Sequence, residues 1–145
     1  MNKDLRQLSE EIQKDVILTR DMDLKKASLD IPYLHHKYLV KYEEQQMVVA
    51  LMKTRKDKRY HEAMMYYSGK AEPEIYREKP LDHTILKTDL ETWIKADENY
   101  IHACLQLSNA EAILDLYKRT VDRIPNHSFY INNTIDLMKF ENGIS

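Results

Sequence analysis

One stretch of the chain concentrates side chains that could hold a polyanion. Residues 53–70, KTRKDKRYHEAMMYYSGK, carry six basic and two acidic side chains, whereas the whole chain has a formal net charge of −2. Cations can follow phosphates and an aromatic ring can stack on an unpaired base, which is the chemistry of single-stranded nucleic-acid binding. The alternative is a solvated helix end, whose basic side chains interact favourably with the negative end of the helix dipole.

Helical periodicity divides this segment into two faces. The face expected to be buried comprises Val49, Tyr60, Ala63, Met64 and Tyr67. The other face carries Arg55, Arg59, Glu62 and Tyr66, with Lys58 beside it. We therefore predict that the nucleic-acid contacts are the basic and aromatic side chains outside the buried stripe, with one histidine: Lys53, Arg55, Lys56, Lys58, Arg59, His61, Tyr66 and Lys70.

Other chemistries lack the residue spacing that they require. The six histidines form neither an HExxH motif nor paired Glu-x-x-His motifs, so we expect no metal site. Two glycines are too few for a phosphate-cradling loop or a dinucleotide fingerprint, and we expect no cofactor. Cys104 lies in an apolar helical pattern and is expected to be buried and unreactive. The sequence offers no catalytic residue, so a helical enzyme subunit is the most distant interpretation.

The composition predicts an all-α protein with a single helical domain over residues 1–145. Only 2 glycines and 4 prolines argue against a sheet with tight turns, and 43% hydrophobic residues suffice for a core. One cysteine allows no internal disulfide, which suits a reducing, intracellular setting. The sequence contains no run of about 18 apolar residues, so we predict no membrane span. The polar N-terminus does not resemble a signal peptide.

Apolar spacing predicts two helices in residues 1–68. The first covers 4–18, and the second begins at Asp21 or Asp23 as its cap. Pro32 either kinks the second helix or separates a short helix that ends at Ile31 from a new one. No further breaker occurs before Gly69, so a long helix follows. Such a helix needs a partner along its length, in a hairpin, a coiled-coil-like pair or an oligomer.

Residues 69–88 are predicted to form a connecting loop because they contain two prolines and a glycine. A third helix follows, with Thr88 and Glu91 as a capping box, and continues to about Ile124. It presents a broad apolar face.

A fourth helix is capped by Asn126 or Ser128 and ends at Gly143. Its apolar side chains are Ile131, Ile135, Met138 and Phe140. A short helix with such a stripe must dock on the domain or on another subunit.

Four motifs follow one another along the chain: LSEEIQKDV (8–16), YYSG (66–69), LKTDLETWIKAD (86–97) and TIDLMKFENG (134–143). This ordered set resembles the UvsY family of recombination mediators from T-even-type phages. The motifs extend over nearly the whole chain, and their order rather than any single motif carries the resemblance.

The resemblance implies a non-enzymatic helical protein that assembles into a ring-shaped heptamer. It implies binding to single-stranded DNA and to a RecA-like recombinase, which is loaded onto strands covered by single-strand-binding protein. The expected processes are recombination, repair and recombination-dependent replication in the cytoplasm of the infected bacterium. The C-terminal helices, residues 89–145, would drive oligomerisation, through the apolar face of the third helix and through Ile131, Ile135, Met138 and Phe140.

The chain departs from the family at one place. The family has a Lys-x-Arg pair just before YYSG, and those positions here are His61 and Ala63. We therefore expect the contacts to lie one to two turns earlier on the same helix, from Lys53 to Arg59. The missing pair and the acidic net charge keep open a second interpretation, a helical oligomeric scaffold that binds only proteins.

Overall fold

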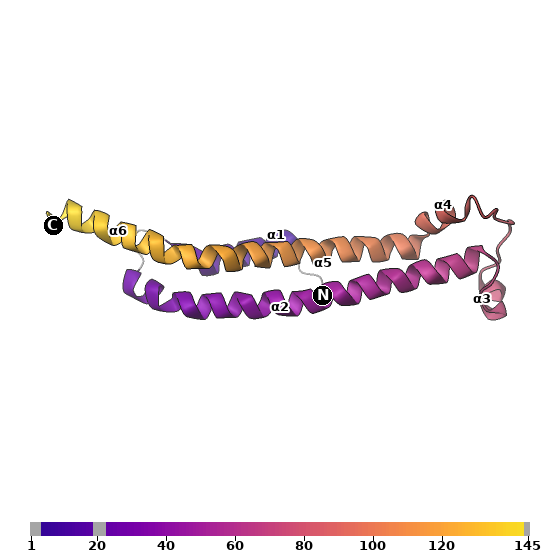
Figure 1. The fold of residues 1–145 in the computed structure, drawn as a ribbon, viewed down its shortest axis with the longest axis horizontal. Helices are drawn as coiled ribbons and strands as arrows, with labels where there is room; N and C mark the ends of the chain where they lie inside the picture. The colour runs from indigo at the N-terminus through magenta and orange to yellow at the C-terminus, as the bar shows by residue number, and fades with distance from the viewer. Residues whose placement is uncertain (1–3, 19–22, 144–145) are drawn as a thin grey trace. The chain divides into compact units, whose positions relative to one another are not determined.

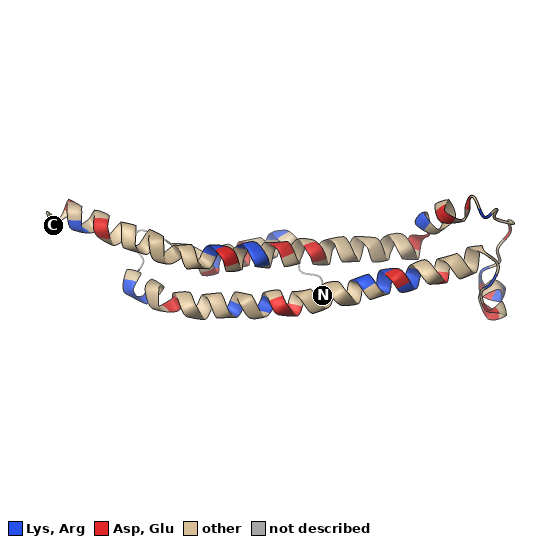
Figure 2. Cartoon of the chain, viewed as in Figure 1, with Lys and Arg blue, Asp and Glu red and all other residues tan. Residues whose placement is uncertain are grey.

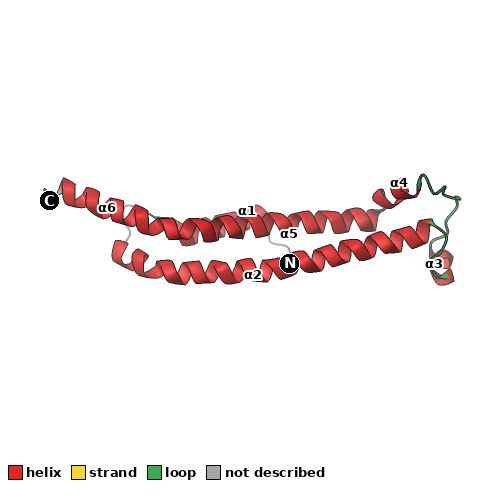
Figure 3. Ribbon diagram, in the orientation of Figure 1, coloured by secondary structure: helices red, strands yellow, loops and turns green. Residues whose placement is uncertain are grey.

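The computed structural model describes residues 4–18 and 23–143. Within these ranges the regular elements are helices and no strand occurs (Figure 3). In chain order they are α1 (Leu5–Val16), α2 (Leu24–Tyr67), α3 (Pro73–Glu78), α4 (Leu90–Lys95), α5 (Glu98–Arg123), the 3₁₀ turn η1 (Ile124–Asn126) and α6 (His127–Glu141) (Figure 1). The prediction of an all-α fold is confirmed.

The chain forms two compact units. The first unit combines residues 1–46 with residues 112–145, and the second unit consists of residues 47–111. Because the boundaries fall inside α2 and α5, each of these helices contributes to both units.

A cluster of apolar side chains forms the core of the first unit. Its buried members come from α1, α2, α5 and η1, and they are Leu8, Ile12, Tyr38, Tyr117 and Ile124. The predicted first helix is confirmed: α1 is capped by Asp4, whose carboxylate accepts the backbone N–H of Arg6 at 3.3 Å.

α2 is a single helix of 44 residues that continues through Pro32. It begins after Asp23, whose Oδ1 accepts the backbone N–H groups of Lys25 and Lys26 at 3.1 and 3.2 Å. The alternative cap, Asp21, lies outside the described residues. The interpretation in which one helix ends at Ile31 is wrong. A proline inside a helix deprives one carbonyl of its donor, and because Pro32 is exposed, water can take that place.

The predicted helix from Thr88 to Ile124 is divided in two. α4 ends at Lys95 and α5 begins at Glu98, with Asp97 between them. The Asp97 carboxylate accepts the backbone N–H of Tyr100 at 3.0 Å and caps α5. Aspartate favours such caps over helix interiors because its side chain competes for backbone donors.

The predicted capping box at the start of α4 is wrong. The cap residue is Asp89, one position after Thr88, and it makes no side-chain cap hydrogen bond. The predicted loop 69–88 is also more structured than expected, since it contains α3, which opens with Pro73 in its first turn.

α6 follows α5 through the 3₁₀ turn. Asn126 occupies the N-cap position, as one of the two alternatives predicted, although its side chain makes no cap hydrogen bond. The predicted end is confirmed: Gly143 has φ of +71°, and its N–H donates to the carbonyl of Phe140 at 3.1 Å.

Candidate nucleic-acid interface

The basic segment occupies the C-terminal part of α2 and the turn that follows it, in the second unit. Blue bands of Lys and Arg mark this part of α2 (Figure 2). Two contacts with α5 fix its register: Arg55 Nη1 donates to Gln106 Oε1 at 3.2 Å, and the rings of Tyr60 and Tyr100 lie 5.6 Å apart. Residue numbers rise on α2 as they fall on α5, so the two segments pair in antiparallel fashion.

The predicted buried stripe of α2 is confirmed. Val49 and Ala63 are buried, and Tyr60, Met64 and Tyr67 are half-buried. The Tyr67 hydroxyl donates to Asp97 Oδ2 at 2.9 Å. Burial, followed by this hydrogen bond, raises the pKa of Tyr67 to about 12. The stripe therefore attaches the end of α2 to the start of α5.

The predicted cations differ in how far they are already engaged. Lys53 and Lys56 have no hydrogen bond or ion pair within the described part of the chain. Arg59 Nη1 lies 2.9 Å from Glu62 Oε2, and Lys58 Nζ lies 4.0 Å from Glu62 Oε1. The Glu62 carboxylate thus pairs with two of the predicted cations, whereas the charges of Lys53 and Lys56 remain available to a ligand. His61 and Lys70 are exposed.

Tyr66 is not the outward, open ring that the helical periodicity suggests. Its ring stacks on Tyr76 of α3 at 5.4 Å and 20°, and the Lys79 ammonium lies 5.4 Å from its centroid. Its hydroxyl donates to the carbonyl of Lys79 at 3.1 Å. The partners come from the segment that the sequence predicted to be a loop. Tyr66 therefore positions α3 and the residues after it.

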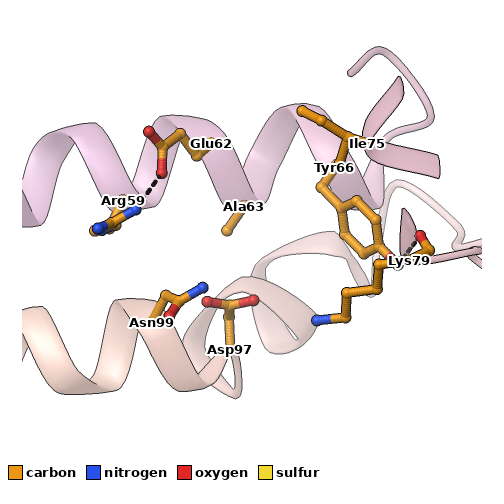
Figure 4. Close-up of a pocket in the computed structure, with 8 residues that line it drawn as sticks. All are labelled: Arg59, Glu62, Ala63, Tyr66, Ile75, Lys79, Asp97 and Asn99. Carbon is orange, nitrogen blue, oxygen red and sulfur yellow. Dashed lines mark hydrogen bonds and ion pairs between the residues drawn. The ribbon is translucent and has the colours of Figure 1, made fainter. Parts of the chain in front are cut away.

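A cavity of about 260 Å³ opens beside this cluster (Figure 4). Its lining comes from α2, from α3 and the residue after it, and from the α4–α5 junction: Arg59, Glu62, Ala63, Tyr66, Ile75, Lys79, Asp97 and Asn99. Sequence reasoning missed Lys79 and Asn99, which carry no motif.

The described residues contain no group of three or more His, Cys, Asp or Glu side chains that could hold a metal ion. In the same ranges, no helix combines the length and apolar character that crossing a bilayer requires. Cys104 is half-buried rather than fully buried. The nearby Cys104 thiol, followed by burial, raises the pKa of Tyr100.

The side chains predicted for oligomerisation occupy different environments on α6. Ile131 is buried within the first unit and Ile135 is half-buried, whereas Met138 and Phe140 are exposed. The exposed apolar set also includes residues that the prediction missed: Phe129, Tyr130 and Leu137. Phe129, Leu137 and Phe140 fall within about 80° on a helix of 3.6 residues per turn. The open apolar face of α6 is therefore not the face that carries Ile131.

Comparisons with known proteins agree with this architecture. No curated protein sequence matches the chain. Among solved structures, two crystal structures of the bacteriophage T4 recombination mediator protein UvsY are similar, each at 22% identity. The first has a TM-score of 0.79 over 97% of this chain and 99% of that chain, and the second has 0.77 over 96% and 99%. These likenesses show the fold.

A family model identifies the relationship independently of the structures. The model of the family described as "Recombination, repair and ssDNA binding protein UvsY" matches residues 11–144. This match covers most of the chain and includes both the basic segment of α2 and the whole of α6. The chain therefore belongs to the UvsY family.

Proposed function

We propose that this chain is a non-catalytic recombination mediator that binds single-stranded DNA. It helps to load a RecA-like recombinase onto strands covered by single-strand-binding protein, during recombination, repair and recombination-dependent replication in the cytoplasm of an infected bacterium. The observation that carries the proposal is the basic end of α2 in a chain of this family. The family description names single-stranded DNA binding, and the similar crystal structures are described as a recombination mediator.

The phosphate contacts are assigned first to the two unpaired lysines. Lys53 and Lys56 offer their charge without breaking an internal ion pair, whereas Arg59 and Lys58 must share theirs with Glu62. Exposed ion pairs contribute little stability, so a phosphate can replace Glu62 as their partner at small cost.

A single basic segment binds weakly, which favours an assembly of several copies. Linked copies raise the effective concentration for every contact after the first. The exposed apolar face of α6, with Phe129, Leu137 and Phe140, is a surface that a neighbouring subunit could cover. A heptameric ring, which the family implies, would repeat the basic segment around one strand. Sedimentation of the full chain at a single subunit's mass would contradict this part of the proposal.

The test of the proposal compares two double variants that remove the same charge. Lys53→Ala with Lys56→Ala removes the unpaired cations, and Lys25→Ala with Lys26→Ala removes two exposed lysines near the start of the same helix. The measurement is the affinity for a single-stranded oligonucleotide as a function of salt. The logarithm of the affinity falls linearly with the logarithm of the salt concentration, and each lost phosphate contact should make this slope shallower by about 0.7. The slope of the first variant should therefore be about 1.4 shallower, and that of the second variant should not change.

Two outcomes decide against the proposal. If the Lys53 and Lys56 variant kept the same salt slope, these two lysines would not contact the phosphates of the strand. If the unmodified chain bound no single strand even at low salt, a scaffold that binds only proteins would be the better function.

A further inference from the structure

We propose that the cavity beside Arg59 and Lys79 receives one unpaired base of the bound strand. This inference rests on the proposed function and assigns a second role within it, because the cavity is distinct from the unpaired lysines that face the phosphates. It concerns the space lined by α2, by α3 with the residue after it, and by the α4–α5 junction (Figure 4).

The charges around the cavity favour a neutral group over a phosphate. Two cations, Arg59 and Lys79, face it together with two carboxylates, Glu62 and Asp97. A phosphate that entered would lie close to both carboxylates, whose negative charge repels it. A base carries no net charge and offers both donors and acceptors to such a mixed set. The charge pattern thus separates a base position from the phosphate positions at Lys53 and Lys56.

The surfaces of the cavity suit the two faces of a flat ring. Ala63 is buried and contributes a small apolar side chain, and Ile75 and the half-buried Tyr66 ring add apolar surface. Arg59 adds a planar guanidinium, and unpaired bases stack on such planes as well as on aromatic rings.

The cavity also offers the polar edge of a base one side-chain amide that has no hydrogen-bond partner within the described residues. Asn99 is exposed, and its amide makes no hydrogen bond within the described residues. An amide offers both a donor and an acceptor to a base edge. Asp97 is already committed, since its two oxygens accept from Tyr67 and from the backbone of Tyr100. Asn99 is therefore the side chain that can respond to a ligand without loss of an existing contact.

The size of the cavity agrees with one ring system. A cavity of about 150 Å³ in another protein holds benzene, and pockets for drug-sized ligands begin at about 300 Å³. At about 260 Å³, the cavity lies between these limits. The volume is therefore sufficient for one base.

The experiment compares two oligonucleotides of equal length at low salt: one unmodified, and one in which every base is replaced by an abasic site. Both keep the same phosphates, so contacts at Lys53 and Lys56 contribute equally. Base stacking in single-strand sites is strong enough that the unmodified strand should bind about tenfold more tightly. Asn99→Ala should reduce this preference several-fold and leave the salt slope unchanged, because no charge is lost.

Asn132→Ala is the matched control, since Asn132 is an exposed asparagine on α6. It should keep the full preference for the unmodified strand. Ala63→Leu, which fills the cavity, should reduce the preference as Asn99→Ala does. Because Ala63 is buried, Asn99→Ala at the surface carries the test if the Ala63 variant fails to fold.

Equal affinity of the unmodified chain for both oligonucleotides would overturn the inference and leave the proposed function intact. A full preference in Asn99→Ala and in a folded Ala63→Leu would also overturn it, because the base would then be held elsewhere. Absence of binding to either strand would overturn the proposed function, and the inference with it.

Discussion

Tyr38 in the first unit and Tyr67 in the second make the same polar contact in different surroundings. Each hydroxyl donates to an aspartate, Tyr38 to Asp15 at 2.6 Å and Tyr67 to Asp97 at 2.9 Å. Tyr38 is 3% exposed and belongs to an apolar cluster with side chains from α1, α5 and η1. Tyr67 is half-buried in a row of rings, next to Tyr66 at 5.0 Å.

The difference between these surroundings is the difference between an apolar core and the surface proposed to bind single-stranded DNA. In the first unit, burial of apolar side chains holds the elements together, and Asp15 joins α1 to α2 by accepting from both Tyr38 and Lys37. At the end of the second unit, rings and hydrogen bonds to backbone carbonyls position short segments, and cations and amides remain exposed beside them. A surface that has to exchange water for a ligand is better built in the second way, because its polar groups are not committed to a core.

The largest expected effect of a substitution is on the first core. Ile124→Ala removes a side chain that is 1% exposed and should lower the free energy of unfolding by about 2–5 kcal/mol. The matched substitution Ile75→Ala, at a side chain 45% exposed in the second unit, should cost less than about 1 kcal/mol. Denaturant unfolding measures both. Equal losses would mean that the exposed fraction of the side chain does not decide the cost of these two substitutions.

A smaller effect is expected when each tyrosine loses only its hydroxyl. Tyr38→Phe should cost about 1.5–2 kcal/mol, because the hydrogen bond to the charged Asp15 is short and the tyrosine is buried. Tyr67→Phe should cost about 1 kcal/mol, since the ring is half-buried and water can reach it. Thermal unfolding of the two variants measures the difference, and the reverse ranking would contradict the comparison.

The smallest effect concerns pH and should appear in the first unit. His127 is buried, and desolvation, followed by the nearby Arg123, lowers its pKa below the ordinary value of 6.5. The unfolded chain then binds the proton more readily, so stability is fully present above about pH 6.5 and is lost as the pH falls through the folded pKa. Protection factors from hydrogen exchange, which are corrected for the intrinsic pH dependence of the exchange rate, should fall in the first unit between pH 7 and pH 5.

Two histidine variants provide the control for the pH effect. His127→Gln should flatten the pH dependence, whereas His102→Gln, at an exposed histidine of the second unit, should leave it unchanged. A pH dependence that survives in His127→Gln would assign the effect to other groups.

Sequence periodicity predicted the features that depend on one helix alone. The buried stripe of α2, the start of α1 and the end of α6 at Gly143 follow from spacing and from caps. Contacts between side chains of different elements could not be predicted from periodicity. Periodicity gave the direction of Tyr66 but not the ring of Tyr76 or the carbonyl of Lys79 that meets it.

The break at Asp97 was missed for a related reason. An aspartate can sit on the exposed face of a helix or cap a new one, and the local sequence allows both. In the fold, Asp97 caps α5 and also accepts from the Tyr67 hydroxyl, which comes from a residue 30 positions earlier. At Pro32 the sequence left a continuous helix and a break both open. The helix continues there, because a proline is tolerated where the carbonyl that it leaves without a donor can meet solvent.

The position of the Asp97 carboxylate links the cavity to the fluorescence of the tryptophan. Asp97 lines the cavity and holds Tyr67, and the Tyr67 ring lies 5.8 Å from Trp93, the single tryptophan of the chain. A ligand that shifts this carboxylate also shifts the ring next to the indole. The tryptophan fluorescence of the chain therefore comes from Trp93 alone, which lies two contacts away from the cavity.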